Sequence, residues 1–412
     1  MGWIALAAFW IGVHAIPAAA YHASAWPGGF RFFDPLDTSA VPKRLSETGL
    51  LQGMDPEKPG IGVHRFEINT ALWSDGAAKI RYLILPPDSR VAWRRDSAFG
   101  FPLGTVFAKT FLIDTLQGDP ASRIALETRL LVKRLADGSP DAQWYGFSYR
   151  WSRDQSEALL VDPQSGLDTV YPVRRPDGVV IAKPWSFPSQ NACWRCHLPR
   201  GRQVLGFFAA QLQGAVAGRN QLADLADLGI FQERPDTTGL HRWFRAADTE
   251  GSLEARARSY LAANCSFCHG AEGFRALGAF LSALHDFDWF RPDAPINYLN
   301  KAAKYDYGIP GALLLYGGDP AKSILIHRMG SRTKPMQMPP LATTEPDTAA
   351  LGMISEWIRT LPGPAATGLR AQRRTGTGRK KGTHRIMQGA QSREGGLPPY
   401  DLSGKRIREF GQ

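Results

Sequence analysis

Short stretches rich in apolar and aromatic residues, in a pattern typical of strands and not of helices, run through the first half of the chain. The clearest cover residues 64–69, 80–85, 105–112, 124–133 and 144–151. Turn-forming residues separate them, as at Pro86-Pro87-Asp88 and Asp137-Gly138. Many short strands with turns between them are typical of an antiparallel sandwich or barrel. The pattern therefore predicts a β-rich, sandwich-like or barrel-like domain over residues 21–186.

The hydrophobic period changes after Ser189. Three later stretches repeat their apolar residues every three or four positions, namely residues 204–225, 253–264 and 347–361. This spacing is that of one face of a helix, and Pro362 would end the last of the three. We therefore predict a multidomain chain whose second part is mainly α-helical, with a helical segment over residues 187–249 and a helical domain over residues 250–362.

The amino terminus has the features of a secretory signal peptide. Residues 3–16 are apolar, and Pro17 and three alanines follow in an A-x-A cleavage pattern. The apolar run is shorter than the roughly 20 residues that a membrane span needs. We therefore predict a signal peptide over residues 1–20, with a retained anchor as the alternative, and no other segment that crosses a membrane.

Net charge is unevenly distributed along the chain. The formal net charge is +11, and eleven Lys or Arg residues against three acidic ones lie after residue 362. The rest of the chain is only mildly basic and has no long basic stripe, so a nucleic-acid partner is not expected. Residues 363–412 are rich in Gly and poor in apolar residues, and we predict a disordered basic tail. Such a tail is either a solvated extension or a contact for an acidic partner or an anionic surface.

All four cysteines belong to two copies of the motif C-x-x-C-H. The copies are Cys193-Trp194-Arg195-Cys196-His197 and Cys265-Ser266-Phe267-Cys268-His269. Two thiols three positions apart reach the two vinyl groups of one porphyrin, and the adjacent histidine can bind its iron. A thioredoxin-like pair or half of a zinc site would not require that histidine. We therefore predict two covalently attached c-type haems, with His197 and His269 as proximal iron ligands.

A methionine is the expected second axial ligand of the second haem. Met338 is followed by two prolines and comes 69 residues after His269. A thioether ligand raises the reduction potential, and prolines stiffen the loop that carries it. Met336 and Met329 are nearby alternatives. We predict Met338 as the distal ligand.

These features resemble those of known haem proteins. Residues 250–362 resemble a class I cytochrome c domain, and residues 45–362 are similar to a bacterial family of dihaem c-type cytochromes with a β-rich amino-terminal region. Besides the two motifs, the likeness is carried by residues 70–81, 126–131, 144–151 and 317–323. The resemblance implies haem binding and electron transfer, and it supplies no substrate. The aromatic stretch over residues 274–290 departs from the pattern.

The distal ligand of the first haem stays open at this point. No methionine lies between His197 and Cys265. The candidates elsewhere are Met54, His64, His241 and His285, each of which also has an ordinary structural explanation. A protein ligand would make the two haems an electron relay, whereas an open position would permit peroxidase-like chemistry.

Several charged residues fall inside the predicted strands. They are Asp75, Lys79, Lys109, Glu127, Arg129 and Arg150. Such residues can line a substrate or docking site, but paired charges on a sheet face are the interpretation that we favour.

The sequence thus predicts a periplasmic electron carrier. Attachment of haem to thiols is normally completed outside the cytoplasm, and the chain has no further cysteine to be oxidised there. Its expected partners are a protein electron donor and a protein electron acceptor, and we assign no catalytic residue. The alternatives are a peroxidase-like haem enzyme with an open first haem and a docking module that accepts electrons from a separate dehydrogenase.

Overall fold

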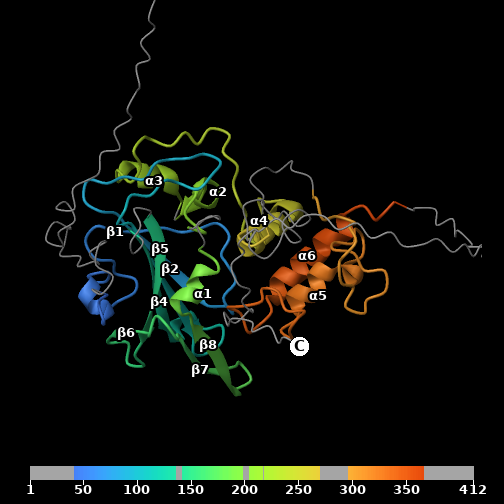
Figure 1. Ribbon diagram of the computed structural model, residues 1–412, viewed down its shortest axis with the longest axis horizontal. Coiled ribbons are helices and arrows are strands. Elements are labelled where there is room, and N and C mark those ends of the chain that lie inside the picture. Colours follow the sequence, from blue (N-terminus) through green and yellow to red (C-terminus); the bar gives the residue numbers. More distant parts are fainter. Residues whose placement is uncertain (1–40, 136–141, 198–203, 217, 270–295, 366–412) are drawn as a thin grey trace, which may run out of the picture. The chain divides into compact units, whose positions relative to one another are not determined.

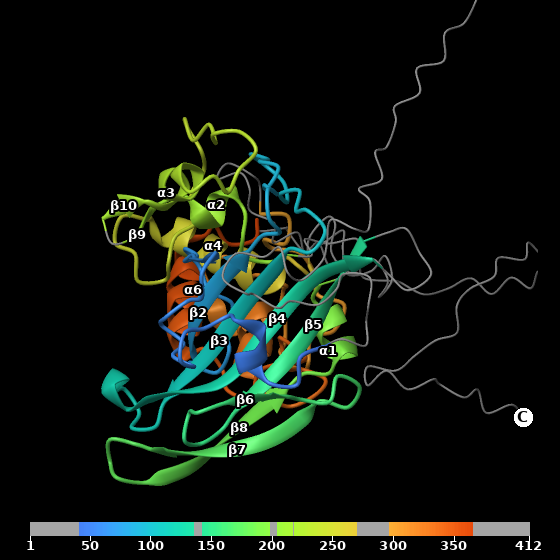
Figure 2. The same ribbon diagram turned by 90° about the vertical axis from the view of Figure 1, so that its left-hand side faces the viewer.

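Six antiparallel strands form the main sheet of this computed structural model (Figure 1). The structure describes residues 41–135, 142–197, 204–216, 218–269 and 296–365. In sheet order, the strands are β1 (Val63–Arg65), β2 (Ala78–Ile84), β3 (Val106–Asp114), β4 (Arg123–Leu135), β5 (Ala142–Trp151) and β6 (Ala158–Leu160). Each strand pairs with the next one along the chain, so the sheet is a simple meander, and Figure 2 shows β2 to β5 running side by side.

The two faces of this sheet have different chemistry. One face is apolar and packs Ile80, Tyr82 and Ala108 against Leu45 and Leu50, which precede the sheet. Because side chains alternate between faces along a strand, the other face receives the intervening residues. Across β2, β3 and β4, those residues are cations in register: Arg81 lies opposite Lys109, and Lys109 lies opposite Arg129.

Two further groups of residues cover parts of the charged face. The hairpin of β7 (Leu167–Arg174) and β8 (Val180–Phe187) packs Trp185 and Phe187 against Phe111 of β3. An aromatic cluster that includes Phe107 and Phe207 covers another part. It is completed by residues of the short helices α2 (Ala209–Leu212) and α3 (Gln221–Asp227), with the hairpin of β9 (Ala215–Val216) and β10 (Arg219–Asn220) between these helices.

The remaining helices form a second apolar core. They are α4 (Leu253–Cys265), α5 (Ile324–Gly330) and α6 (Thr348–Thr360). Tyr260 and Leu261 of α4 pack against Ile354 and Trp357 of α6. Ser252 and Asp347 cap the amino ends of α4 and α6, each by accepting a hydrogen bond from a backbone N–H. Both helices agree with the sequence prediction.

The prediction of a mainly α-helical second part is wrong. Helix α1 (Gln190–Trp194), α2 and α3 are short, and long stretches with neither helix nor strand separate the described helices. Residues 204–225 do not form one helix: Gly214 and Gly218 have φ values of +149° and +80°, and the β9–β10 hairpin occupies the middle. Such values interrupt a right-handed helix. A six-stranded antiparallel sheet takes the place of the predicted sandwich or barrel.

Several predictions stay untested. The described residues belong to one compact unit, residues 1–365, and the predicted boundaries after residues 186, 249 and 362 stay predictions. The signal peptide, residues 274–290, His285 and residues 366–412 of the basic tail lie outside the described residues. Within the described residues, we find no helix with the length and apolar character of a membrane span.

Candidate functional site

The first C-x-x-C-H motif forms a single tight turn at the end of α1. The Ser189 hydroxyl caps this helix by accepting a hydrogen bond from the N–H of Ala192 at 3.3 Å. The N–H groups of Cys196 and His197 both donate to the carbonyl oxygen of Cys193, at 3.1 Å each. The turn therefore holds both thiols and the imidazole in one short segment.

Helix α1 lies directly against β5. The indole Nε1 of Trp194 donates to the carbonyl oxygen of Trp144 at 3.2 Å. At Gly146, an added Cβ would lie 2.7 Å from both Cβ and Sγ of Cys193. Real Cβ atoms do not approach other atoms so closely, so glycine at this position is what lets the motif sit on the sheet (Figure 2).

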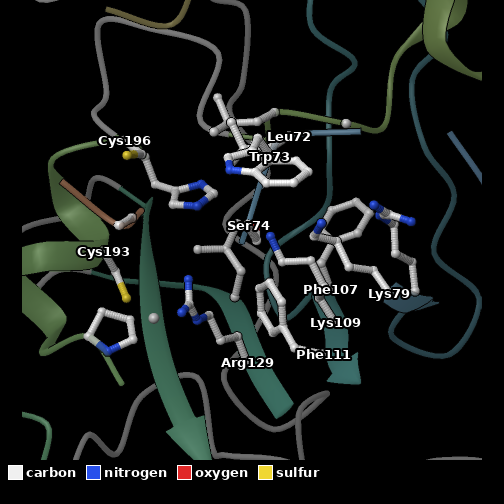
Figure 3. A pocket seen from close by; sticks show the side chains of 18 of the residues that line it. Leu72, Trp73, Ser74, Lys79, Phe107, Lys109, Phe111, Arg129, Cys193 and Cys196 are labelled. Carbon is white, nitrogen blue, oxygen red and sulfur yellow. The ribbon is translucent and has the colours of Figure 1, made fainter. Parts of the chain in front are cut away.

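A cavity of about 370 Å³ opens between this motif and the charged face of the sheet. Its lining includes Cys193, Cys196 and His197. Much of the remaining wall is apolar and comes from Phe66, Phe107, Phe111, Leu131, Trp185, Val204 and Phe207. Figure 3 shows Lys109 and Arg129 extending from the sheet into the cavity. Cys193 and Cys196 line the same cavity. Its volume is within the usual range for small-molecule and cofactor sites.

Four cations line the same cavity, and two of them have carboxylate partners. They are Lys79, Arg81, Lys109 and Arg129. Arg129 makes two hydrogen bonds to the buried carboxylate of Glu127, at 2.7 and 2.9 Å. Glu127 also accepts a hydrogen bond from Trp185 Nε1 at 3.0 Å. Arg81 lies 3.8 Å from a carboxylate oxygen of Glu67.

Neither Lys79 nor Lys109 forms an ion pair with a described carboxylate, although Asp75 attracts the first and Glu127 the second electrostatically. Lys79 Nζ donates to the carbonyl oxygen of Ala77 at 3.1 Å. Lys109 Nζ lies over the ring of Phe111, 5.0 Å from its centroid, and makes no hydrogen bond to any described residue. Burial, with the neighbouring cations, lowers the pKa of Lys109 to about 7 and that of Lys79 well below its usual value. The wall therefore favours a bound anion, which would offset this charge.

These features fit a haem group at the first motif. Two thiols and an imidazole stand on one side of an apolar cavity, and Gly146 provides the close approach that places them there. Haem also carries two carboxylates, and four cations of the sheet line the cavity wall. Cys193, Cys196 and His197 could therefore hold the macrocycle, with the sheet cations facing its acidic groups.

The second motif repeats the turn of the first. Helix α4 ends at Cys265, whose carbonyl oxygen accepts hydrogen bonds from the N–H groups of Cys268 at 3.1 Å and His269 at 2.8 Å. Burial raises the pKa of both thiols to about 12. The Cys268 thiol also interacts electrostatically with that of Cys196. The fold therefore brings the two motifs, 72 residues apart in the sequence, close together.

Met338 lies in the connection between α5 and α6. Its N–H donates to the carbonyl oxygen of Arg328 at 2.9 Å, and its side chain is half-buried. Of the two alternatives, Met329 is buried in the core between α4 and α6, whereas Met336 is half-buried. The choice of Met338 as an iron ligand stays a prediction.

Residues 73–75 join the Met338 loop and α4 to the cavity. The Asp75 carboxylate accepts hydrogen bonds from the N–H and hydroxyl of Thr344, at 2.9 Å each, and from the N–H of Glu345 at 3.1 Å. Trp73 donates through Nε1 to the carbonyl oxygen of Glu345, and through its N–H to the side chain of Asn264 on α4. These contacts link the two motifs through one short segment.

Changing Asp75 to Asn is expected to destabilise the holoprotein by about 1.5–3 kcal/mol, because charge-assisted hydrogen bonds to Thr344 and Glu345 are lost. The φ of Asp75 is +51°, a conformation that asparagine also tolerates, so the variant isolates the hydrogen bonds from backbone strain. Urea unfolding would measure the change, with the exposed Asp96→Asn as the control. Equal stabilities of the Asp75→Asn and Asp96→Asn variants would show that the hydrogen bonds of Asp75 do not stabilise the fold.

The three described candidates for the first distal ligand, Met54, His64 and His241, do not line the cavity. Met54 packs with the apolar core on the opposite face of the sheet. His64 belongs to β1, and His241 interacts electrostatically with Arg258 of α4. Neither histidine lines the cavity, and His285 lies outside the described residues. Among the described residues, the cavity wall includes no methionine and no histidine besides His197.

The competing explanations of the cysteine pairs find no support in this geometry. All four cysteines are free thiols. Burial raises the pKa of each thiol, whereas a reactive redox pair needs a lowered one. In the described part of the chain, no group of three His, Cys, Asp or Glu side chains is arranged to hold a metal ion, as a zinc site would require.

Sequence reasoning missed two residues of this site. Gly146 and Arg81 were part of segments quoted for the resemblance, but neither was singled out. The alternation of side chains between the two faces along β2, β3 and β4 is the signal that could have placed the cations on one face.

No protein-family model, curated protein or solved structure matches this chain.

Proposed function

We propose that this protein is a dihaem c-type cytochrome that transfers electrons between protein partners. The observation that carries the proposal is the first motif: two thiols and an imidazole border an apolar cavity whose opposite wall is cationic. When bound, haem iron supplies a one-electron redox couple. Cys193 and Cys196 would attach the group, and His197 would bind the iron.

The cavity wall would serve this function in two ways. Aromatic side chains such as Phe107 and Phe111 exclude water, which lowers the local dielectric and raises the influence of each nearby charge. Lys79 would face an acidic group of the cofactor, and that contact would offset the cost of burying this cation.

The second motif extends this proposal to a relay. Cys265, Cys268 and His269 would hold the second group, with Met338 as the ligand on the far side of its iron. The electrostatic interaction between the thiols of Cys196 and Cys268 supports short-range electron transfer between the two sites. We also propose a periplasmic location, with one protein partner that donates electrons and another that accepts them.

The test is the number of covalently bound haems in protein produced with a haem-attachment system. Two are expected in the wild type, and one in each paired variant, Cys193→Ala with Cys196→Ala and Cys265→Ala with Cys268→Ala. Intact mass and haem staining after denaturing electrophoresis would count them, because only covalent haem survives denaturation. Wild-type protein that carries no covalent haem would overturn the proposal.

A further inference from the structure

The cation row of the sheet has Lys109 at its centre. Arg81 and Arg129 flank it on the neighbouring strands, and each of these arginines has a carboxylate partner, Glu67 and Glu127 respectively. Lys109 forms no ion pair with a described residue, although Glu127, the partner of Arg129, attracts it electrostatically. Its side chain is half-buried, and it lines the cavity. Its amine is therefore available to whatever the cavity binds.

Lys109 is also close to the first motif. Its ammonium interacts electrostatically with the Cys196 thiol, as does the guanidinium of Arg129. Figure 3 shows Lys109 extending from β3 into the cavity that Cys193 and Cys196 border. A group held by those cysteines would therefore lie next to this amine.

Few side chains of the cavity could bind a haem iron opposite His197. Methionine and further histidine are absent from its described wall, and the two lysine amines are the remaining nitrogen ligands. Guanidinium groups stay protonated and have no lone pair to offer. Lys79 Nζ is already hydrogen bonded to the carbonyl oxygen of Ala77, whereas Lys109 Nζ lies over the ring of Phe111 and makes no hydrogen bond to a described residue.

We propose that Lys109 Nζ is the second axial ligand of the first haem, opposite His197. This inference rests on the proposed function, since it requires a haem at Cys193 and Cys196. An unprotonated amine has the lone pair that ligation needs, and a buried lysine loses its proton more readily than an exposed one. A nitrogen ligand on each side of the iron makes the site six-coordinate and low-spin. The first haem is then a carrier closed to small molecules, in place of an open peroxidase-like site.

Spin state and carbon monoxide binding test this assignment on the holoprotein. Wild-type protein should show two low-spin haems by electron paramagnetic resonance, and neither should bind carbon monoxide when reduced. In Lys109→Leu, one haem should become high-spin and bind one equivalent of carbon monoxide. Lys109→Arg should behave in the same way, because it keeps the charge but cannot ligate.

Lys133→Leu is the matched control, because Lys133 is a half-buried lysine of β4 that does not line the cavity, and its loss should leave both haems low-spin. Added methylamine should restore the low-spin signal in a Lys109→Ala variant, which separates lost ligation from misfolding. A wild-type haem that binds carbon monoxide, or two low-spin haems in Lys109→Leu, would overturn the assignment. In both cases the covalent haem count would still be two, whereas failure of the proposed function would leave no covalent haem.

Discussion

Replacing Glu127 with leucine is expected to lower the free energy of unfolding by about 3–5 kcal/mol, which is the usual cost of removing one partner of a buried ion pair. The Glu127 side chain has no exposed surface, and it makes two hydrogen bonds to Arg129 and one to Trp185. Without it, the Arg129 guanidinium faces Lys109 across β3 and β4 with no compensating charge. Denaturant unfolding followed by far-ultraviolet circular dichroism would measure the loss.

Two further variants make this measurement specific. Glu233 is exposed, so Glu233→Leu should change stability by less than about 0.5 kcal/mol. Changing Glu127 and Arg129 together to leucine should recover most of the loss, because the double variant leaves neither partner of this ion pair without the other. A single Glu127→Leu variant as stable as the wild type would show that Arg129 does not depend on this carboxylate.

Changing Gly146 to alanine should reduce the haem content of the protein from two towards one per chain. The new Cβ would lie 2.7 Å from Cβ and Sγ of Cys193, so α1 must move away from β5. The Cys193 thiol, which would attach the first haem under the proposed function, is itself displaced. Alanine is tolerated in strands, so the loss comes from this contact and not from the backbone of β5. The ratio of haem absorbance to protein mass would measure it.

Gly206→Ala is the control for this variant. Gly206 also lines the cavity, but an added Cβ there meets its nearest atom, Cγ2 of Ile68, at 3.4 Å. This is an ordinary van der Waals distance, and haem content should stay at two per chain. Full haem content in Gly146→Ala would mean that α1 can shift without cost. The close approach of Gly146 to Cys193 would then not be needed for haem attachment.

The helix predictions succeeded or failed for a local reason that depends on glycine. Residues 253–264 and 347–361 contain one glycine between them, at Gly352, and both form helices close to the predicted bounds. Residues 204–225 have the same apolar spacing but include Gly214 and Gly218, which adopt positive φ values. A regular apolar spacing indicates which residues are buried, but it does not by itself require a helix. Residues of this segment are buried in the aromatic cluster that packs on the sheet, and they do so without forming one continuous helix.

The sequence by itself determined the local features of this protein. The positions of β2 to β5 follow from the strand-like stretches of the sequence, and a C-x-x-C-H turn needs only its own five residues to form. Only the tertiary structure decided which charges share a surface, because that depends on the register between strands far apart in the chain. Arg81, Lys109 and Arg129 meet through such pairing. The same packing puts Met54 on the opposite face and brings Cys196 near Cys268, and neither result follows from spacing along the sequence.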